Sequence, residues 1–468
     1  MNDMSRSPRD PDRIRAAIDA IAQRLGPRLD RGEAMRVQHA HSTSWIAPQL
    51  PDAVAFAESE AEVQDIVRIC ADHGCPLIPF GTGTSLEGHV NAPEGGLSLD
   101  VGRMDNVLAV RPEDMDCTIQ PGVTRRRLNE ELRATGLFFP VDPGADASLG
   151  GMAATGASGT CAVRYGTMRE SVLGLRAVLA NGEVIKTAAR ARKTSAGFDL
   201  TRLMVGSEGA LGVITELTLR LHGIPEAVVG ARASFPTVAS AAQAVTETIQ
   251  MGIPVARLEL LDALTVKAVN AYANLTLPET PLLLAEFHGA EGSVAADAET
   301  FGAICNGNEG TGFASSADPD ERNRLWRARH DAYWAIRRLR PESQGISTDT
   351  CVPISRLADA VSAAAERAER DGIIAPILGH AGDGNFHVAL LVDMDSPEER
   401  ARAEAYLGWL NDLAIGMDGT CTGEHGIGQG KSKYLAKELG ASTIDAMRAV
   451  KLALDPQGIM NPGKMGLI

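Results

Sequence analysis

Three histidines and one glutamate near the C-terminal end of the chain could bind a metal ion and take up a proton. His380 and His387 flank the pair Asp383-Gly384, and Glu424 and His425 are neighbours further along the chain. An Asp-Gly pair favours a two-residue turn between apolar strands. The spacing therefore predicts a hairpin in which His380 lies directly opposite His387 on one face of a sheet.

Two histidines in that arrangement could share one divalent metal. Directly opposed residues place their Cβ atoms about 4.5–5.5 Å apart, which suits two imidazoles that converge on one ion. A third ligand has to come from elsewhere, and Glu424 is the natural candidate. Two nitrogens and one carboxylate leave coordination positions open, as in catalytic sites. A pair of hydrogen-bonded histidines at a sheet end is the alternative that the spacing alone leaves open.

Two loops rich in small residues could hold a phosphorylated cofactor. The segment from Gly81 to Ser85 follows the apolar strand 76–80, and its backbone N–H groups and hydroxyls could form an anion-binding concavity. It lacks the Gly-Lys-Ser/Thr of a P-loop, and Leu86 stands where a dinucleotide fingerprint needs its third glycine. The second loop, 142–166, has few large side chains and would bury little apolar area, so it favours a flat cofactor against the backbone. A structural turn and a flexible linker are the respective alternatives.

Composition limits the function classes. The formal net charge of −15 and the pI of about 5.2 argue against nucleic acid or an anionic membrane as the main partner. No run of 18 apolar residues occurs, so we expect no transmembrane segment. Residues 1–30 lack an apolar signal core and carry too many acids for a mitochondrial presequence. Seven scattered cysteines without a C-x-x-C pair indicate reduced thiols. We therefore expect a cytoplasmic protein, or one peripheral to a membrane.

The elements that must position these residues point to an α+β protein. With 468 residues, the chain should form two or three domains. In the N-terminal half, the patterns predict helices at 13–26 and 60–70 and near 124, and strands at 76–80, 96–101, 107–111, 116–120, 172–180 and 183–187. From about 226 onward, strands (228–235, 255–261, 282–288, 346–352, 374–380, 386–393) alternate with helices (237–251, 262–273, 320–339, 355–371, 396–417), followed by a helical segment at 432–455. This alternation predicts an antiparallel sheet covered by helices.

Four motifs resemble the FAD domain of the vanillyl-alcohol-oxidase, or PCMH-type, flavoproteins. They lie at 79–84, 140–144, 162–166 and 205–209. The nearest resemblance is to the D-lactate dehydrogenase (cytochrome) branch, which neighbours the glycolate oxidase flavin subunit and D-2-hydroxyglutarate dehydrogenase. It implies two α+β subdomains that hold FAD and an α+β cap domain with an antiparallel sheet. The implied domains are a helical lead at 1–44, the FAD-binding domain at 45–224, a substrate or cap domain at 225–420, and a C-terminal segment at 421–468 that returns to the FAD domain.

The resemblance also implies which residues contact FAD. The first loop should meet the pyrophosphate, Ile214 the adenine side, and Asn461 the flavin. The full set is Pro79, Gly81, Thr82, Gly83, Thr84, Ser85, Gly88, His89, Pro143, Gly144, Gly150, Ala153, Gly156, Ser158, Gly159, Ile214 and Asn461. Some relatives attach FAD covalently through a histidine of the first loop. His89 follows Gly88 and does not fall in that slot, so we expect non-covalent FAD.

The same resemblance assigns roles to the C-terminal cluster. It implies a divalent metal, zinc or manganese, on His380, His387 and Glu424, with His425 as the base. Arg329 matches the arginine that binds the substrate carboxylate, a task that suits a guanidinium fork. Tyr333 stands where dicarboxylate-using relatives have a small hydroxyl residue, and Ser347 where they have a lysine. Both differences favour a monocarboxylate, and D-lactate is the leading substrate.

The implied reaction oxidises a D-2-hydroxy acid to the 2-oxo acid. The metal would acidify the 2-hydroxyl, His425 would take its proton, and the C2 hydrogen would leave as hydride to flavin N5. The chain has neither a haem-attachment motif nor iron–sulfur spacing, so the electron acceptor should be external; the resemblance suggests cytochrome c or a membrane quinone chain. Alternatives are a glycolate oxidase flavin subunit, a D-2-hydroxyglutarate dehydrogenase, and a non-catalytic FAD-binding electron-transfer subunit. The chain keeps all five site residues, namely Arg329, His380, His387, Glu424 and His425, and this argues against a non-catalytic subunit.

Overall fold

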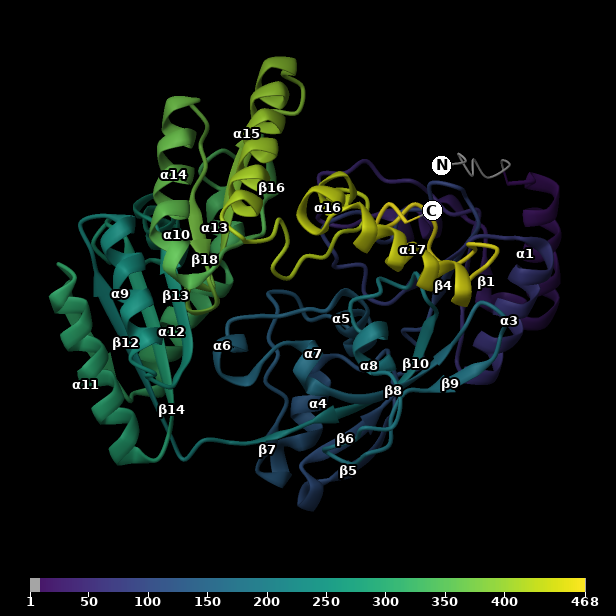
Figure 1. Cartoon of the computed structure of the whole chain (residues 1–468), viewed down its shortest axis with the longest axis horizontal. Helices are drawn as coiled ribbons and strands as arrows, with labels where there is room; N and C mark the ends of the chain where they lie inside the picture. The colour runs from purple at the N-terminus through teal and green to yellow at the C-terminus, as the bar shows by residue number, and fades with distance from the viewer. Residues whose placement is uncertain (1–8, 468) are drawn as a thin grey trace.

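Two sheets form the N-terminal half of the protein, and a larger sheet forms the cap (Figure 1). The structure, a computed structural model, describes residues 9–467. The cap and the N-terminal half lie side by side, and the C-terminal helices α16 and α17 lie over the N-terminal half. The predicted α+β fold, with two subdomains and a cap built on an antiparallel sheet, is confirmed.

The first subdomain is a four-stranded sheet in the order β1-β2-β4-β3, in which β2, β4 and β3 are parallel. Strand β3 is an edge strand, which explains why it tolerates Pro79, because proline cannot donate to an inner ladder. The elements are α1 (Pro11–Leu25), β1 (Leu29–Asp30), α2 (Glu33–Ala40), β2 (Ala53–Phe56), α3 (Glu60–His73), β3 (Leu77–Phe80) and β4 (Leu97–Asp100). Apolar faces of α1 and α3 pack on this sheet, as their spacing predicted.

The second subdomain is an antiparallel sheet in the order β5-β6-β10-β8-β9. The two predicted strands at 172–180 and 183–187 form a hairpin with its turn at Asn181-Gly182, since β8 pairs with β9 and Gly182 has a φ of 76°. The strands are β5 (Val107–Arg111), β6 (Asp116–Ile119), β8 (Val172–Val178), β9 (Val184–Lys186) and β10 (Val213–Arg220), with β7 (Leu137–Phe138) and β11 (His222–Gly223) paired separately. The helices are α4 (Arg125–Leu132), α5 (Leu149–Thr155), α6 (Ala162–Tyr165), α7 (Met168–Ser171) and α8 (Leu200–Met204).

The cap is an eight-stranded antiparallel sheet with helices on both faces. The strand order is β15-β12-β14-β13-β18-β19-β16, and the eighth strand, β17, pairs with β19 outside this order. The strands are β12 (Ala227–Ser234), β13 (Val255–Leu261), β14 (Leu282–Gly289), β15 (Thr311–Ser316), β16 (Gln344–Ser347), β17 (Thr350–Cys351), β18 (Ile377–Gly379) and β19 (Asn385–Val392). Every residue of β19 is buried, because both faces of the strand are covered.

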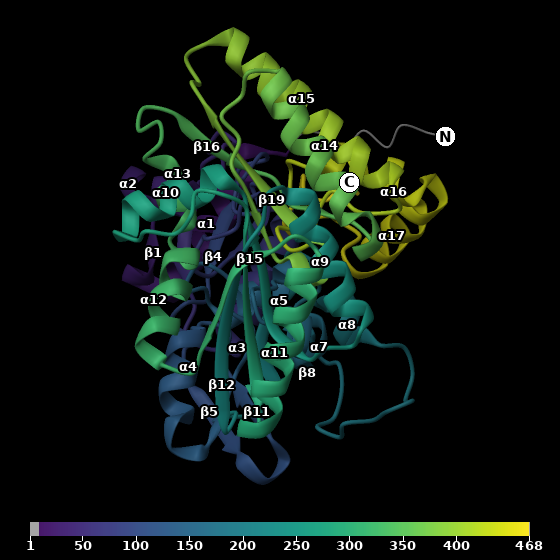
Figure 2. The ribbon, with the colours of Figure 1, turned by 90° about the vertical axis from the view of Figure 1, so that its left-hand side faces the viewer.

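The cap helices divide between the two faces of this sheet. Figure 2 shows α9 and α11 on one side of β12 and β15, and α12 on the other. One face carries α9 (Val238–Gln250), α11 (Glu291–Gly307), α14 (Leu357–Arg370) and α15 (Pro397–Gly416), and the other carries α10 (Ala263–Ala273), α12 (Pro319–His330) and α13 (Ala332–Arg337). Helices α16 (Ser432–Leu439) and α17 (Ala441–Leu454) then lead the chain back to the N-terminal half.

The C-terminal tail completes the first subdomain. Leu77 donates its N–H to the Ile459 carbonyl at 2.8 Å, and Asn461 donates its N–H to the Leu77 carbonyl at 2.8 Å. The tail therefore pairs with the outer edge of β3. Lys451 anchors α17, because its Nζ donates to the carbonyl of Ala210 at 2.6 Å.

Several predicted elements differ from the structure. The predicted helix at 320–339 divides at Asp331, the segment at 432–455 divides at Gly440, and the predicted strand at 346–352 becomes β16 and β17. Gly440 has a φ of 82°, which no continuous helix accommodates. The small-residue loop at 142–166 contains α5 and α6. Helix α11 and strand β15 were not predicted, because the many small residues of α11 form no clear apolar stripe.

Asp262 gives a pH-dependent test of the cap fold. It caps α10 by accepting the Thr265 N–H at 2.7 Å, and burial raises its pKa to about 6. Between the ordinary Asp pKa and pH 6, the folded state binds more protons than the unfolded state, so stability falls as pH rises through this window. Asp262→Asn keeps the N-terminal cap of helix α10. It should increase the free energy of unfolding by about 2 kcal/mol at pH 7.5 and by little at pH 4.5. Urea unfolding at the two pH values measures this; an equal gain at both would contradict it.

Candidate active site

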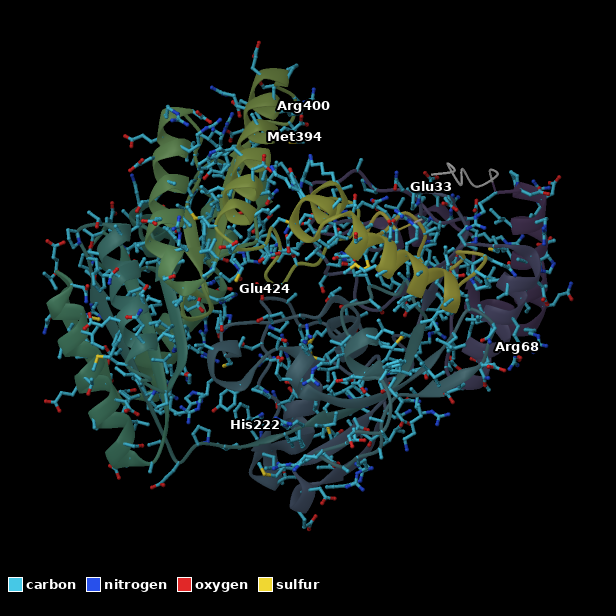
Figure 3. The ribbon with its side chains drawn as sticks, viewed as in Figure 1. Glu33, Arg68, His222, Met394, Arg400 and Glu424 are labelled. Carbon is cyan, nitrogen blue, oxygen red and sulfur yellow. The ribbon has the colours of Figure 1, made fainter. Side chains whose placement is uncertain are left out.

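A cavity of about 500 Å³ lies where the cap meets the N-terminal half. Its volume is in the usual range of ligand sites. One wall consists of the two loops rich in small residues, and the other of α12, β16, the β18–β19 connection and the segment that carries Glu424. Glu424 lies between the cap and the N-terminal half (Figure 3). The cavity thus brings the two loops of small residues together with the histidines and the glutamate near the C-terminal end of the chain.

Most of the residues predicted to contact FAD line this cavity. Ser85 and the neighbouring Ser148 have buried Oγ atoms without a hydrogen-bond partner among residues 9–467. Such hydroxyls need an acceptor or donor, and a pyrophosphate would supply one, so the loops fit a dinucleotide. A Cβ on Gly81 would lie 2.3 Å from the Ser148 Oγ, so a side chain there would displace this hydroxyl. The lining residues are Pro79, Gly81, Thr82, Gly83, Thr84, Ser85, His89, Pro143, Gly144, Ser158 and Asn461.

Six other predicted FAD residues do not line the cavity. A Cβ on Gly150 would lie 2.4 Å from the Cβ of Pro121, and one on Gly159 would lie 2.5 Å from the Asp142 carbonyl carbon. Both glycines therefore permit close backbone packing behind the loop. Ile214 is part of the core of the second subdomain. The six are Gly88, Gly150, Ala153, Gly156, Gly159 and Ile214, and their contact with FAD stays a prediction.

Glu208 is a cavity residue to which the sequence analysis gave no role. Its carboxylate accepts the N–H groups of Ile427 at 2.6 Å and Gly428 at 2.8 Å, and its Oε1 lies 3.3 Å from Nε2 of His89. It therefore ties the segment after His425 to the first loop. The only signal in the sequence was its place in the motif at 205–209.

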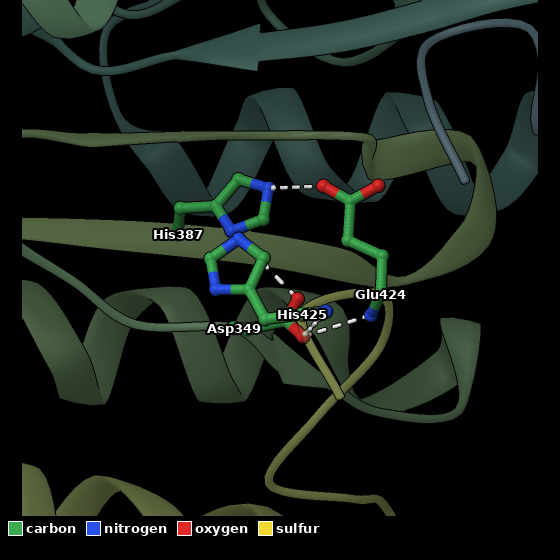
Figure 4. A group of neighbouring side chains, drawn as sticks. All are labelled: Asp349, His387, Glu424 and His425. Carbon is green, nitrogen blue, oxygen red and sulfur yellow. Dashed lines mark hydrogen bonds and ion pairs between the residues drawn. The ribbon is translucent and has the colours of Figure 1, made fainter. Parts of the chain in front are cut away.

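The predicted metal ligands converge on one point. Nε2 of His380 lies 3.2 Å from Oε1 of Glu424, and Nε2 of His387 lies 3.3 Å from the same oxygen. Figure 4 shows the contact of His387 with Glu424. Three side chains from two distant segments therefore share one site.

The predicted hairpin register is wrong, although the two histidines do meet. Strand β19 pairs His387 with Leu378, not with His380. A 3₁₀ turn at Ala381–Asp383 replaces the two-residue turn, with Gly384 at a φ of 74°. Val352, which follows β17, donates its N–H to the Gly384 carbonyl at 3.0 Å, and a Cβ on Gly384 would lie 2.2 Å from the Val352 carbonyl oxygen, so the turn is packed tightly against this residue. The two imidazole centroids are nevertheless 5.4 Å apart.

Hydrogen bonds on the far side of each ring determine its protonation. Nδ1 of His380 contacts Oε1 of Glu259 at 2.8 Å, and Nδ1 of His387 contacts the Thr348 carbonyl at 2.9 Å. Both partners only accept, so each Nδ1 carries a hydrogen and each Nε2 is the ring atom left to face Glu424. Two imidazole nitrogens and one carboxylate oxygen that face one another favour a positive charge at the point between them. The residues therefore fit a divalent metal.

The pKa shifts in the cluster also favour a positive charge between these side chains. Burial by itself would lower the pKa of His380, but the carboxylates of Glu259 and Glu424 outweigh it and raise that pKa well above its usual value. Burial would raise the pKa of Glu424, but His380 and His387 lower it well below its usual value. The site thus takes up positive charge at the point where the three side chains meet.

Asp349 lies close enough to this cluster to be a metal ligand, but its oxygens are already engaged. Oδ2 accepts the N–H groups of Glu424 at 2.8 Å and His425 at 2.7 Å (Figure 4). It also accepts the Thr422 hydroxyl at 2.9 Å. Oδ1 accepts the Asn385 amide at 3.0 Å. Asp349 therefore holds the Glu424–His425 turn, and its oxygens are less available to a metal than Nε2 of His380.

His425 has the properties of a neutral base. Its ring stacks on His387 with centroids 5.2 Å apart and planes 4° apart. Its Nδ1 is buried without a hydrogen-bond partner among the described residues. Burial lowers its pKa to about 4, so the ring is uncharged near neutral pH. It also lines the cavity.

Arg329 reaches the cavity from α12, and two of its three guanidinium nitrogens already contact Glu259. Its Nε and Nη2 lie 2.8 Å and 2.6 Å from Oε2 of Glu259, and the side chain lines the cavity. The remaining amine, Nη1, is therefore the group available to a ligand. Tyr333 and Ser347 line the same wall, as the sequence analysis expected of substrate-side residues.

The fold and the cavity define a flavin-dependent oxidoreductase. The family described as "FAD binding domain" matches residues 51–188, and "FAD linked oxidases, C-terminal domain" matches residues 224–465. The chain belongs to the FAD-linked oxidases, and FAD is its cofactor. A 4-ethylphenol oxidase from Gulosibacter chungangensis shares the fold, with a TM-score of 0.81 at 17% identity over 98% of both chains.

Two curated relatives are similar over most of their length. A "Probable D-lactate dehydrogenase, mitochondrial" from Danio rerio is 48% identical over 93% of this chain and 88% of its own. A "D-lactate dehydrogenase [cytochrome], mitochondrial" from Arabidopsis thaliana is 46% identical over 90% of this chain and 74% of its own. The resemblance to the D-lactate dehydrogenase (cytochrome) branch is confirmed.

The predicted cytoplasmic location is wrong. Both relatives are named as mitochondrial proteins. The prediction rested on net charge, cysteine spacing and the composition of residues 1–30, and none of these determines the compartment of a protein. Of the N-terminal lead, residues 1–8 lie outside the described part of the chain. Within residues 9–467, every helix is too short or too polar to cross a bilayer.

Acid denaturation tests whether FAD is attached covalently. His89 is the histidine of the first loop, and it is buried beside Glu208. We expect the flavin to stay in the supernatant when trichloroacetic acid precipitates the protein, because the usual tethering position holds Leu86 or Glu87. A flavoprotein with covalent FAD, whose pellet remains yellow, is the control. A fluorescent protein band on a denaturing gel would contradict the prediction.

Proposed function

We propose that this protein is an FAD- and metal-dependent dehydrogenase of D-2-hydroxy acids that converts D-lactate to pyruvate. One observation carries the proposal: two imidazole Nε2 atoms and one carboxylate converge in a cavity that is also lined by the flavin loops and by Arg329. The names of the two relatives support D-lactate as the substrate.

The wall opposite the flavin loops suits a 2-hydroxy monocarboxylate. Arg329 would bind the carboxylate through Nη1, because charge-assisted hydrogen bonds to guanidinium are strong. Tyr333 and Ser347 are uncharged and would leave a second carboxylate without a cationic partner. A dicarboxylate such as D-2-hydroxyglutarate is therefore disfavoured.

His380, His387 and Glu424 would hold the divalent metal, and zinc and manganese both accept such ligands. A bound divalent ion supplies a Lewis acid that lowers the pKa of a nearby hydroxyl. Because Asp349 holds the backbone N–H groups of Glu424 and His425, the ligand and the neighbouring ring are oriented by the same turn.

His425 would take the proton from the substrate hydroxyl. Its ring is neutral, lines the cavity and stacks on His387, so it lies beside the proposed metal ligands. Bound FAD supplies the acceptor for the two electrons that leave C2. The electrons then pass to an external acceptor, and we propose cytochrome c, in keeping with the name of the Arabidopsis relative.

Anaerobic flavin reduction tests the substrate and the base. We expect D-lactate to bleach the bound flavin faster than glycolate or D-2-hydroxyglutarate does. His425→Ala should keep its yellow colour and reduce about 10²–10⁴-fold more slowly, because a positioned base contributes this much. His73→Ala, on the outer helix α3, is the control. Faster bleaching by glycolate would reassign the substrate, and unchanged reduction in His425→Ala would exclude this residue as the base.

Metal analysis tests the proposed centre directly. Protein purified without chelator should contain about one equivalent of zinc or manganese. Dialysis against a chelator should abolish reduction by D-lactate while FAD remains bound, and the metal should restore it. His387→Ala should lose the metal and retain FAD. Full activity in metal-free protein would refute this part of the proposal.

A further inference from the structure

Glu259 links the proposed metal site to the proposed substrate anchor. It lies on β13 and is fully buried, with 0% exposure. Its Oε1 contacts Nδ1 of His380 at 2.8 Å, and its Oε2 accepts from Arg329. We propose that Glu259 is a positioning residue that fixes the tautomer of His380 and the orientation of Arg329. This inference rests on the proposed function, because it assigns Glu259 to the same site.

A carboxylate at this position is unfavourable unless it is paired. The neighbouring residues Leu258, Leu260 and Leu261 are buried and apolar. Arg329 donates to Oε2 of Glu259 at 2.8 Å, and Nδ1 of His380 contacts Oε1 at 2.8 Å. The two oxygens are therefore divided between the two partners, which compensate the carboxylate inside the sheet.

For His380, the consequence is a defined tautomer. Glu259 accepts the Nδ1 hydrogen and so leaves the Nε2 lone pair directed at Glu424, 3.2 Å away. Metal-binding histidines generally carry such a partner, and its loss costs roughly 10–100-fold in metal affinity. For Arg329, the consequence is that Nε and Nη2 are occupied and Nη1 remains for the ligand. One carboxylate thereby sets the spacing between the metal and the carboxylate-binding group.

A second buried carboxylate in the same sheet provides a matched control. Glu286 lies on the adjacent strand β14 and is 4% exposed. It contacts His288 at 2.8 Å, Arg257 at 3.4 Å and Arg322 at 3.6 Å, so it also pairs with one histidine and with arginine. None of these four side chains lines the cavity, and none contacts a proposed metal ligand. Glu286 therefore resembles Glu259 in burial and charge but lies away from the proposed metal site.

Glu259→Gln separates positioning from general stability. The amide offers one acceptor group to two partners that both donate. When its oxygen accepts from Arg329, its NH₂ faces Nδ1 of His380, which must then accept. The ring hydrogen of His380 then moves to Nε2, so this nitrogen no longer offers a lone pair to the metal. The full-length, FAD-loaded protein, stripped of metal, is titrated with Zn²⁺ in competition with a chromophoric chelator.

We expect the Zn²⁺ dissociation constant to rise roughly 10–100-fold in Glu259→Gln and to stay at the wild-type value in Glu286→Gln, although both variants lose thermal stability. Equal Zn²⁺ affinity in wild type and Glu259→Gln would overturn the inference and leave the proposed function intact. A wild-type protein that does not bind Zn²⁺ or Mn²⁺ would overturn both. Should Glu259→Gln fail to fold, Glu259→Asp, which keeps the charge on a shorter side chain, replaces it: weaker Zn²⁺ binding supports the inference, and unchanged binding overturns it.

Discussion

A buried carboxylate must be matched by donors or cations, and this requirement holds the site together. Glu208, Glu259 and Asp349 are all buried, and each takes its partners from distant parts of the chain. Glu208 accepts from the segment that follows His425, and Asp349 accepts from the turn that carries Glu424. Removing any of these carboxylates would leave unpaired donors in the interior. The positions of the proposed ligands are therefore consequences of how these three charges are satisfied.

The two walls of the cavity use different physical means. The wall formed by the first loop and the segment 142–160 consists mainly of small residues and hydroxyls, which let a large cofactor approach the backbone. The cap wall carries ionisable side chains, with Arg329 and the histidines among them. The C-terminal tail pairs with β3 and so connects both walls to one subdomain. A flat cofactor and a small charged substrate would each meet the surface that suits it.

Much of the fold could be predicted because its elements are locally determined. Strand β13 and helix α9 carry clear periodic patterns, and Asn181-Gly182 specifies its own turn. Where local signals were weak, prediction failed: α11 has few large apolar residues, and α5 lies in a segment that looked like a loop. The Asp383-Gly384 pair suggested a tight hairpin, but the structure has a 3₁₀ turn followed by Gly384, which is hydrogen-bonded to Val352, much earlier in the chain. This non-local contact cannot be read from the local turn preference.

The sequence by itself determined the class of protein and the identity of the residues that could do chemistry. Motifs are contiguous, so the small-residue loops and the Glu424-His425 pair could be recognised before any fold was known. Only the tertiary structure decided how these residues are supported. Glu259 and Asp349 lie in an ordinary strand and connection, and nothing in their neighbours along the chain distinguishes them. Glu208 lies in the motif at 205–209, but the motif does not show which groups its carboxylate accepts from. Their roles arise because the sheet of the cap and the returning C-terminal segment bring donors to them across long sequence separations, and such contacts exist only once the chain has folded.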